Sequence, residues 1–324
     1  MSISETRDHI ELLRTRMQYD VMGRDNVIDL ILVALLADGH VLLEDFPGSG
    51  KTTLAKSLGN SLKPEGVREG MSAFRRMQFT PDLLPGDITG VMVFDPDSNQ
   101  FHFRRGPIFA HIVLVDEINR TSPKVQSALL ESMGEKQVTV DEVTHPLTDL
   151  FFVIATQNPL DAVGTYPLPI AQLDRFMFKI RMTSISREAE LSVIKSWGRP
   201  RTACDLDKIT VDDILEARKI VQNEVSVSDG VMQCLVDIIR TIREDSRCLQ
   251  GASTRSIVQA VPALQAHAFL QKRDYVSAKD IEDLAIALFA HRLQLAPGAG
   301  DADNLVLESI AKPLQKLSKD SLYA

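Results

Sequence analysis

Short apolar runs alternate with helix-like stretches along the chain up to about residue 182. The runs have the length and composition of buried parallel strands, and they are Val41–Leu43, Met77–Phe79, Ile112–Val115, Phe151–Ala155 and Phe176–Ile180. Helical patterns lie between them at Thr52–Leu62 and Ser122–Met133. The alternation predicts a doubly wound α/β domain with a mostly parallel sheet.

Two further segments have the pattern of hairpins inserted into this domain, near residues 88–104 and 136–147. In the first, apolar residues surround the turn-rich stretch Asp95–Asn99, and in the second they flank Asp141 and Glu142. Ordinary surface loops are the alternative interpretation of both segments.

After Ser184 only helical patterns remain. Thr210 and Ser277 each precede an acidic residue by three positions, which is typical of a helix start. One apolar face follows at helical spacing, formed by Val231, Leu235, Ile238, Ile239 and Ile242. We therefore expect an α/β core over residues 1–200 and a smaller, all-helical domain over 201–324, with the boundary within the Gly- and Pro-containing stretch 197–207.

The first strand runs directly into a glycine-containing loop that has the composition of a phosphate cradle. Its residues are Pro47, Gly48, Ser49, Gly50, Lys51, Thr52 and Thr53. The glycines allow backbone N–H groups to surround an anion, Lys51 can reach the outer phosphates, and the Thr52 hydroxyl can hold Mg²⁺. Asp45 occupies the first glycine position of the usual pattern. A glycine-rich turn before a helix is the alternative.

Two later strands end in polar residues suited to hydrolysis. Asp116 and Glu117 follow the run Ile112–Val115, so Asp116 could bind Mg²⁺ and Glu117 could accept a proton from the attacking water. Asn158 follows the next strand, and the carboxyl ends of parallel strands meet at one edge. A solvated strand end and an ordinary Asn-Pro turn are the alternatives.

Composition and charge narrow the choice of partners and compartment. The chain has 324 residues, a net charge of −8 and a sequence pI near 5.4, which argues against general affinity for nucleic acids and favours a protein partner. We find no signal-peptide pattern and no apolar run long enough to cross a membrane, so we expect a cytoplasmic protein without membrane insertion. The three cysteines are widely spaced and predict neither a zinc site nor a disulfide framework.

Several long motifs resemble those of the MoxR family of AAA+ ATPases. They are Gln78–Pro85, Asp116–Glu131, Gly164–Phe176 and Gly251–Arg255, and they add to the phosphate loop (Walker A) and the Asp116–Glu117 pair (Walker B). The resemblance covers nearly all of the chain. Aspartate is common in the family at the position of Asp45, whereas Thr254 stands where proline is common.

The resemblance implies further roles for individual residues. Asn158 resembles the sensor 1 residue, and Arg175 resembles the arginine finger that reaches the nucleotide of a neighbouring subunit. Arg255 resembles sensor 2, acting either within its own subunit or on the next. Val21, Met22 and Gly23 would line the adenine pocket. For Arg175, an ion pair with Asp174 or another surface acid is the alternative.

The resemblance also implies a function. We expect a Mg²⁺-dependent ATPase that binds ATP and assembles into a hexameric ring of identical subunits. Such proteins act as chaperones in the maturation of others, including the insertion of metal cofactors, often with a partner that carries a von Willebrand factor A domain. A DNA-associated AAA+ machine, a magnesium-chelatase-like ATPase subunit and a nucleotide-gated scaffold with little turnover are the alternatives. The sequence does not identify the client protein.

Overall fold

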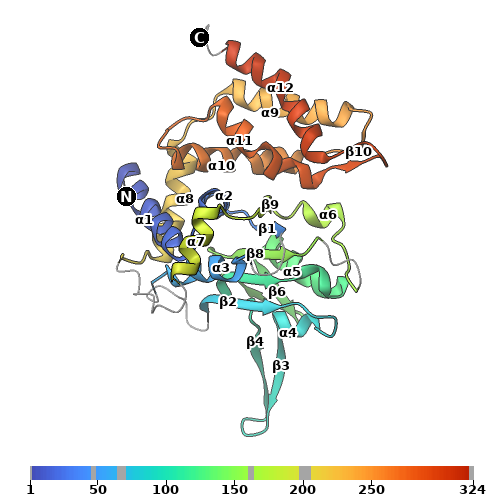
Figure 1. Cartoon of the computed structure of the whole chain (residues 1–324). Coiled ribbons are helices and arrows are strands. Elements are labelled where there is room, and N and C mark those ends of the chain that lie inside the picture. Colours follow the sequence, from blue (N-terminus) through green and yellow to red (C-terminus); the bar gives the residue numbers. More distant parts are fainter. Residues whose placement is uncertain (1, 45–48, 64–70, 160–163, 197–205, 321–324) are drawn as a thin grey trace.

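A five-stranded parallel sheet forms the centre of the molecule (Figure 1). The computed structural model describes residues 2–44, 49–63, 71–159, 164–196 and 206–320. The strand order is β2-β5-β8-β1-β9, with β1 at Val41–Glu44, β2 at Ser72–Gln78, β5 at Ala110–Asp116, β8 at Phe152–Gln157 and β9 at Phe178–Arg181. The predicted α/β class with a parallel sheet is confirmed. Strand β2 begins earlier than predicted, because an edge strand tolerates exposed residues such as Arg75 and Arg76.

Helices cover both faces of this sheet. On one face, alternate strand residues such as Leu43 and Ile154 share an apolar core with α1 (Ile3–Asp20), α2 (Asp25–Leu36) and α3 (Lys51–Asn60). On the other face, Leu42 and Val153 share a second core with α5 (Pro123–Glu135) and α4 (Pro85–Thr89). The helix α3 after the phosphate loop and the helix α5 after Asp116 therefore lie on opposite faces. The short helix η1 (Ile118–Arg120) precedes α5.

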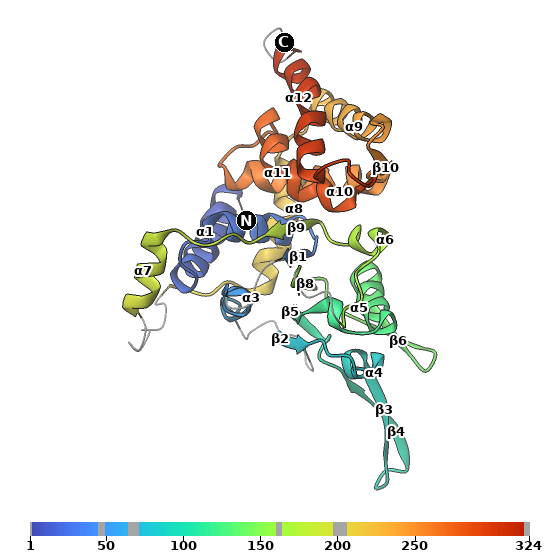
Figure 2. The same ribbon diagram turned by 45° about the vertical axis from the view of Figure 1, so that its right-hand side comes forward.

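Both segments with a hairpin pattern form antiparallel two-stranded hairpins. The first pairs β3 (Gly90–Asp95) with β4 (Gln100–Arg105), and the second pairs β6 (Gln137–Val140) with β7 (Val143–Pro146). The first hairpin extends far from the rest of the molecule in both views (Figures 1 and 2). The rings of Phe103 and His145 stack with centroids 3.9 Å apart, which joins the bases of the two hairpins.

The C-terminal part is helical and lies above the sheet in Figures 1 and 2. The remaining helices are α6 (Ile170–Leu173), α7 (Arg187–Ser196), α8 (Val211–Glu224), α9 (Asp229–Glu244), α10 (Thr254–Leu270), α11 (Ala278–Phe289), η2 (Ala290–Arg292) and α12 (Ala302–Asp320). Thr210 and Ser277 precede α8 and α11, as predicted. Thr210 and Asp213 exchange reciprocal capping bonds, whereas the N–H and the hydroxyl of Ser277 both donate to the carboxylate of Asp280.

The expectation of an all-helical C-terminal part needs one correction. Two short strands, β10 (Cys248–Gln250) and β11 (Gln294–Leu295), pair antiparallel. Each is too short to carry an alternating apolar pattern, and tertiary contact alone brings them together. None of the described helices is both long and apolar enough to cross a membrane.

Candidate functional site

The phosphate loop leads into α3 at the carboxyl end of β1. Gly50 precedes the helix with φ of +92°, a left-handed conformation that favours glycine, and a Cβ there would meet no atom within 4 Å. Lys51 is the first helical residue, and Thr52 and Thr53 are exposed in the same turn. Of the predicted loop, Pro47 and Gly48 lie outside the described residues, as does Asp45.

This helix start has the features of an anion site. The first backbone N–H groups of a helix have no partner within it and carry a partial positive charge. The hydroxyl of Ser49 is buried and finds no hydrogen-bond partner among the described residues. An open glycine, an orphaned buried hydroxyl and a lysine at one helix N-terminus fit a polyphosphate.

The Asp116 carboxylate lies at the end of β5, two strands away from β1. Its residue is only 6% exposed, which fixes its position. Oδ1 accepts a hydrogen bond of 3.3 Å from the hydroxyl of Thr156, and Oδ2 lies 2.6 Å from Nε of Arg76. Mg²⁺ prefers oxygen ligands, and both the carboxylate of Asp116 and the hydroxyl of Thr52 are ligands of this kind. The described residues hold no cluster of three metal-ligating side chains, which a Mg²⁺ bound between phosphates does not require.

Glu117 has an unusual backbone conformation directly after β5. Its φ is +58°, in the left-handed region that costs energy for a residue with a Cβ. The backbone N–H donates to Thr156 Oγ1 at 3.0 Å. Its carboxylate accepts from Nε2 of Gln78 at 2.9 Å and pairs with Nε of Arg120 at 3.1 Å. The side chain is one-third exposed, so water can reach it.

Asn158 is half-buried and follows β8, the strand between β5 and β1. Because β8 pairs with both neighbours in parallel, its end lies between the phosphate loop and Asp116. The structure therefore brings Lys51, Thr52, Asp116, Glu117 and Asn158 to one edge of the sheet, as the sequence predicts.

The turn Val21–Gly23 approaches the same region from the junction of α1 and α2. Val21 is buried, Met22 half-buried and Gly23 exposed, with φ of +70°. A Cβ on Gly23 would meet Ala189 of α7 at 2.6 Å. The next residue, Arg24, donates to the backbone carbonyls of Ser49 at 3.3 Å and of Thr183, which links this turn to the phosphate loop.

Arg175 and Arg255 lie elsewhere, in a second cluster. Arg175 Nη1 donates to the carbonyl of Leu130 on α5 at 2.8 Å, and no ion pair with Asp174 forms. Arg255 is exposed in the first turn of α10. The two segments are joined by Asp174, whose carboxylate accepts from Ser256 Oγ at 3.1 Å and Ser253 Oγ at 3.3 Å.

Sequence reasoning missed several residues of both clusters. Arg24, Arg76 and Gln78 contact the first, and Arg292 contacts Asp174 in the second. The polar side chains of Arg76 and Gln78 alternate along a strand that ends beside Asp116, and this period-two pattern was the available signal. Arg292 carries no local signal for this role, because Phe176 and Gln259, to which its Nη2 donates, lie more than 30 residues away in sequence.

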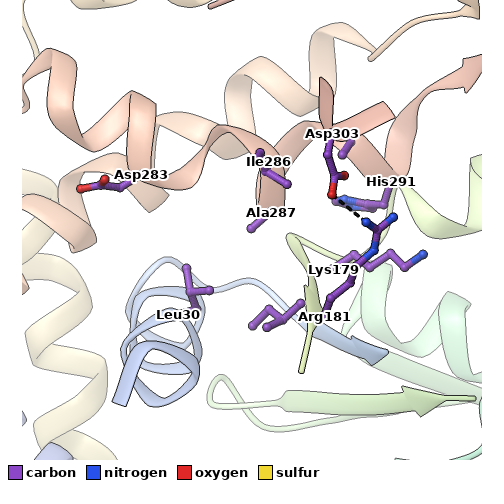
Figure 3. Close-up of a pocket in the computed structure, with 10 residues that line it drawn as sticks. Leu30, Lys179, Arg181, Asp283, Ile286, Ala287, His291 and Asp303 are labelled. Carbon is purple, nitrogen blue, oxygen red and sulfur yellow. Dashed lines mark hydrogen bonds and ion pairs between the residues drawn. The ribbon is translucent and has the colours of Figure 1, made fainter. Parts of the chain in front are cut away.

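A cavity of about 250 Å³ lies between strand β9 and the C-terminal helices (Figure 3). Arg181 reaches from β9 to Asp303 of α12 at 2.7 Å and also lies 3.3 Å from Glu44, the residue before the phosphate loop. Burial raises the pKa of Asp303, and Arg181 opposes this effect. Arg181 therefore pairs with one carboxylate on each side of the junction.

Comparison with known proteins agrees with this geometry. Residues 40–178 match the family model described as "ATPase family associated with various cellular activities (AAA)", and residues 240–310 match an AAA lid domain. The chain is 35% identical to the chaperone MoxR1 of Mycobacterium tuberculosis, covering 90% of this chain and 79% of that protein. It is 43% identical to the uncharacterized protein YeaC of Bacillus subtilis, covering 92% and 91% of the two chains. A crystal structure of a proposed ATPase from Cytophaga hutchinsonii superposes with a TM-score of 0.85 at 35% identity, covering 96% of both chains.

Proposed function

The chain belongs to the MoxR family of AAA+ ATPases, and on that premise we propose that it uses Mg²⁺-dependent ATP hydrolysis in a hexameric ring to remodel or mature partner proteins. ATP is its substrate, and the chaperone named among its relatives supports the remodelling role. We also propose two domains, an α/β nucleotide-binding core over residues 1–200 and a helical lid over residues 201–324.

The first cluster is the half-site that binds ATP and activates water. Lys51 and the N-terminus of α3 hold the phosphates, and Val21–Gly23 line the adenine pocket. Mg²⁺, held by Thr52 and Asp116, would supply charge neutralisation at the phosphates. Glu117 accepts the proton of the attacking water, while Asn158 orients that water.

The topology of Arg175 is the observation that carries the ring proposal. Met177, two residues on, donates its N–H to the carbonyl of His40 at 2.8 Å, just before β1 begins. Arg175 therefore lies at the amino edge of the sheet, whereas Lys51 lies at the carboxyl edge. The four residues of β1 alone span about 13 Å at about 3.3 Å per residue.

Arg255 shares this placement, since Ser253 and Ser256 beside it bind Asp174. From this placement we infer that neither arginine reaches the phosphates of its own chain. We therefore assign both arginines to the nucleotide of the adjacent subunit, where a guanidinium stabilises charge on the leaving phosphate. Each site is then completed only on assembly, which is the reason for a closed ring.

The proposed output is conformational work on another protein. The two hairpins are the proposed contacts with that client or with a partner protein that carries a von Willebrand factor A domain. Metal-cofactor insertion is one form of maturation that this machine would drive, and the cytoplasm is its proposed location.

A complementation experiment tests the composite site. Glu117→Gln subunits should bind ATP with nearly unchanged affinity but without turnover, and Arg175→Ala subunits should also be inactive. Mixing the two should restore phosphate release, because some interfaces pair an intact Glu117 with an intact Arg175. Equal loss of binding and turnover in Glu117→Gln would count against Glu117 as the base. Mixed rings that stay inactive would overturn the assignment of Arg175 to the neighbouring site.

A further inference from the structure

The guanidinium of Arg292 is almost completely buried behind the segment that carries Arg175. The residue is 1% exposed and belongs to η2, more than 100 positions away in sequence. Its Nη2 donates to the carbonyl of Phe176 at 2.9 Å, and its Nη1 lies 3.4 Å from Oδ1 of Asp174. One side chain thus contacts the residue before Arg175 and the residue after it.

The same guanidinium also contacts the helix that carries Arg255. Its Nη2 donates to Oε1 of Gln259 at 2.8 Å, and Gln259 lies one turn after Arg255 on α10. A second contact, separate from Arg292, holds the N-terminus of α10, because the hydroxyls of Ser253 and Ser256 donate hydrogen bonds to the carboxylate of Asp174. Burial lowers the pKa of Arg292 to about 10, and the nearby positive charge of Arg255 contributes to this shift, so Arg292 stays charged at neutral pH.

We propose that Arg292 is a positioning residue that holds Arg175 and Arg255 as one unit facing the neighbouring subunit's nucleotide. This inference rests on the function proposed above. A planar guanidinium suits the role because Nη2 can donate to a carbonyl and an amide oxygen while Nη1 faces a carboxylate at a fixed angle, which an ammonium does not reproduce. Movement of the C-terminal helices would then carry both arginines together, so that the lid and the finger engage the adjacent site in one step.

The test replaces the planar guanidinium of Arg292 with an ammonium group, which keeps the positive charge. Arg292→Lys rings should assemble and bind ATP within about twofold of the native affinity, but kcat should fall on the order of tenfold to a hundredfold, because small misplacements of catalytic groups have effects of this size. Mixing with Glu117→Gln subunits should restore turnover, as it should for Arg175→Ala. Gln259→Ala, which frees only α10, should cause a smaller loss in the same direction.

Arg218→Lys is the matched control. Arg218 is also buried, at 6% exposure, donates to a backbone carbonyl (Leu35, 2.8 Å) and pairs with a carboxylate (Asp38, 2.5 Å), but it contacts neither arginine segment. If Arg292 had a purely structural role, Arg292→Lys and Arg218→Lys should change kcat equally. The proposal is overturned if Arg292→Lys keeps native turnover, or if its loss is not restored in mixtures that rescue Arg175→Ala. If Arg175→Ala is not rescued either, the neighbouring-site function itself has failed.

Discussion

Gly134 leaves room on α5 for the guanidinium of Arg175. A Cβ at this position would lie 2.3 Å from Arg175 Nη1, too close for any real contact. The obstructing atom is the far end of a flexible side chain, so an alanine would displace Arg175 rather than unfold the helix. Glycine within a helix lowers the free energy of unfolding by about 0.5–1 kcal/mol relative to alanine. At this position the glycine allows the Arg175 side chain to lie against α5.

We expect Gly134→Ala to move stability and activity in opposite directions. The free energy of unfolding should rise by up to about 1 kcal/mol, while kcat falls on the order of tenfold as Arg175 shifts. Denaturant unfolding and phosphate release measure the two quantities. Ser127→Ala, at an exposed position of the same helix, is the control that should leave kcat unchanged. A Gly134→Ala ring with native turnover would contradict the importance of this contact.

Helix α11 begins at a buried carboxylate that serves several donors at once. Asp280 is 0% exposed and binds Arg273 through both carboxylate oxygens, His267 Nδ1 at 2.7 Å, and the N–H and hydroxyl of Ser277. Burial raises the pKa of Asp280, but these hydrogen bonds outweigh burial and hold the pKa well below its ordinary value of 3.8. The helix start is therefore stabilised by a charge that remains ionised.

Asp280→Asn should lower the free energy of unfolding by on the order of 3 kcal/mol at neutral pH, because it leaves buried donors without a charged partner. A carboxyl whose native pKa is depressed stabilises the fold above its unfolded pKa, and this contribution declines as the pH falls below about 4. The difference between native protein and variant should thus shrink on acidification. Asp283→Asn, one turn on and partly exposed, is the control with a small effect. A difference that is independent of pH would contradict the account.

One apolar core runs through most of the molecule. It joins the face of the sheet beneath α2 and α3 to helices α8 to α12, so the C-terminal helices share their core with the α/β part. Arg218 reinforces the junction, since it extends from α8 to the carbonyl of Leu35 in α2. A shared core couples the unfolding of the parts that it joins.

We expect the nucleotide-free chain to unfold in one calorimetric transition. Arg218→Met should lower the midpoint without dividing the transition, at a cost of about 3 kcal/mol. Arg240→Met is the control, because Arg240 is 68% exposed on α9 and exposed ion pairs contribute little. Two separate transitions in the native chain would show that the core and the C-terminal helices fold independently.

Local chemistry was sufficient to predict much of this protein. Strand runs, capping residues and the glycine loop act over a few neighbouring positions, so the parallel sheet, the starts of α8 and α11, and the shared edge of Lys51, Asp116 and Asn158 follow from sequence. Tertiary structure alone decided the rest. The contacts of Arg175 with Leu130 and of Arg292 with Phe176 join residues 45 and 116 positions apart. No periodicity encodes such distances, because they depend on how the finished elements pack.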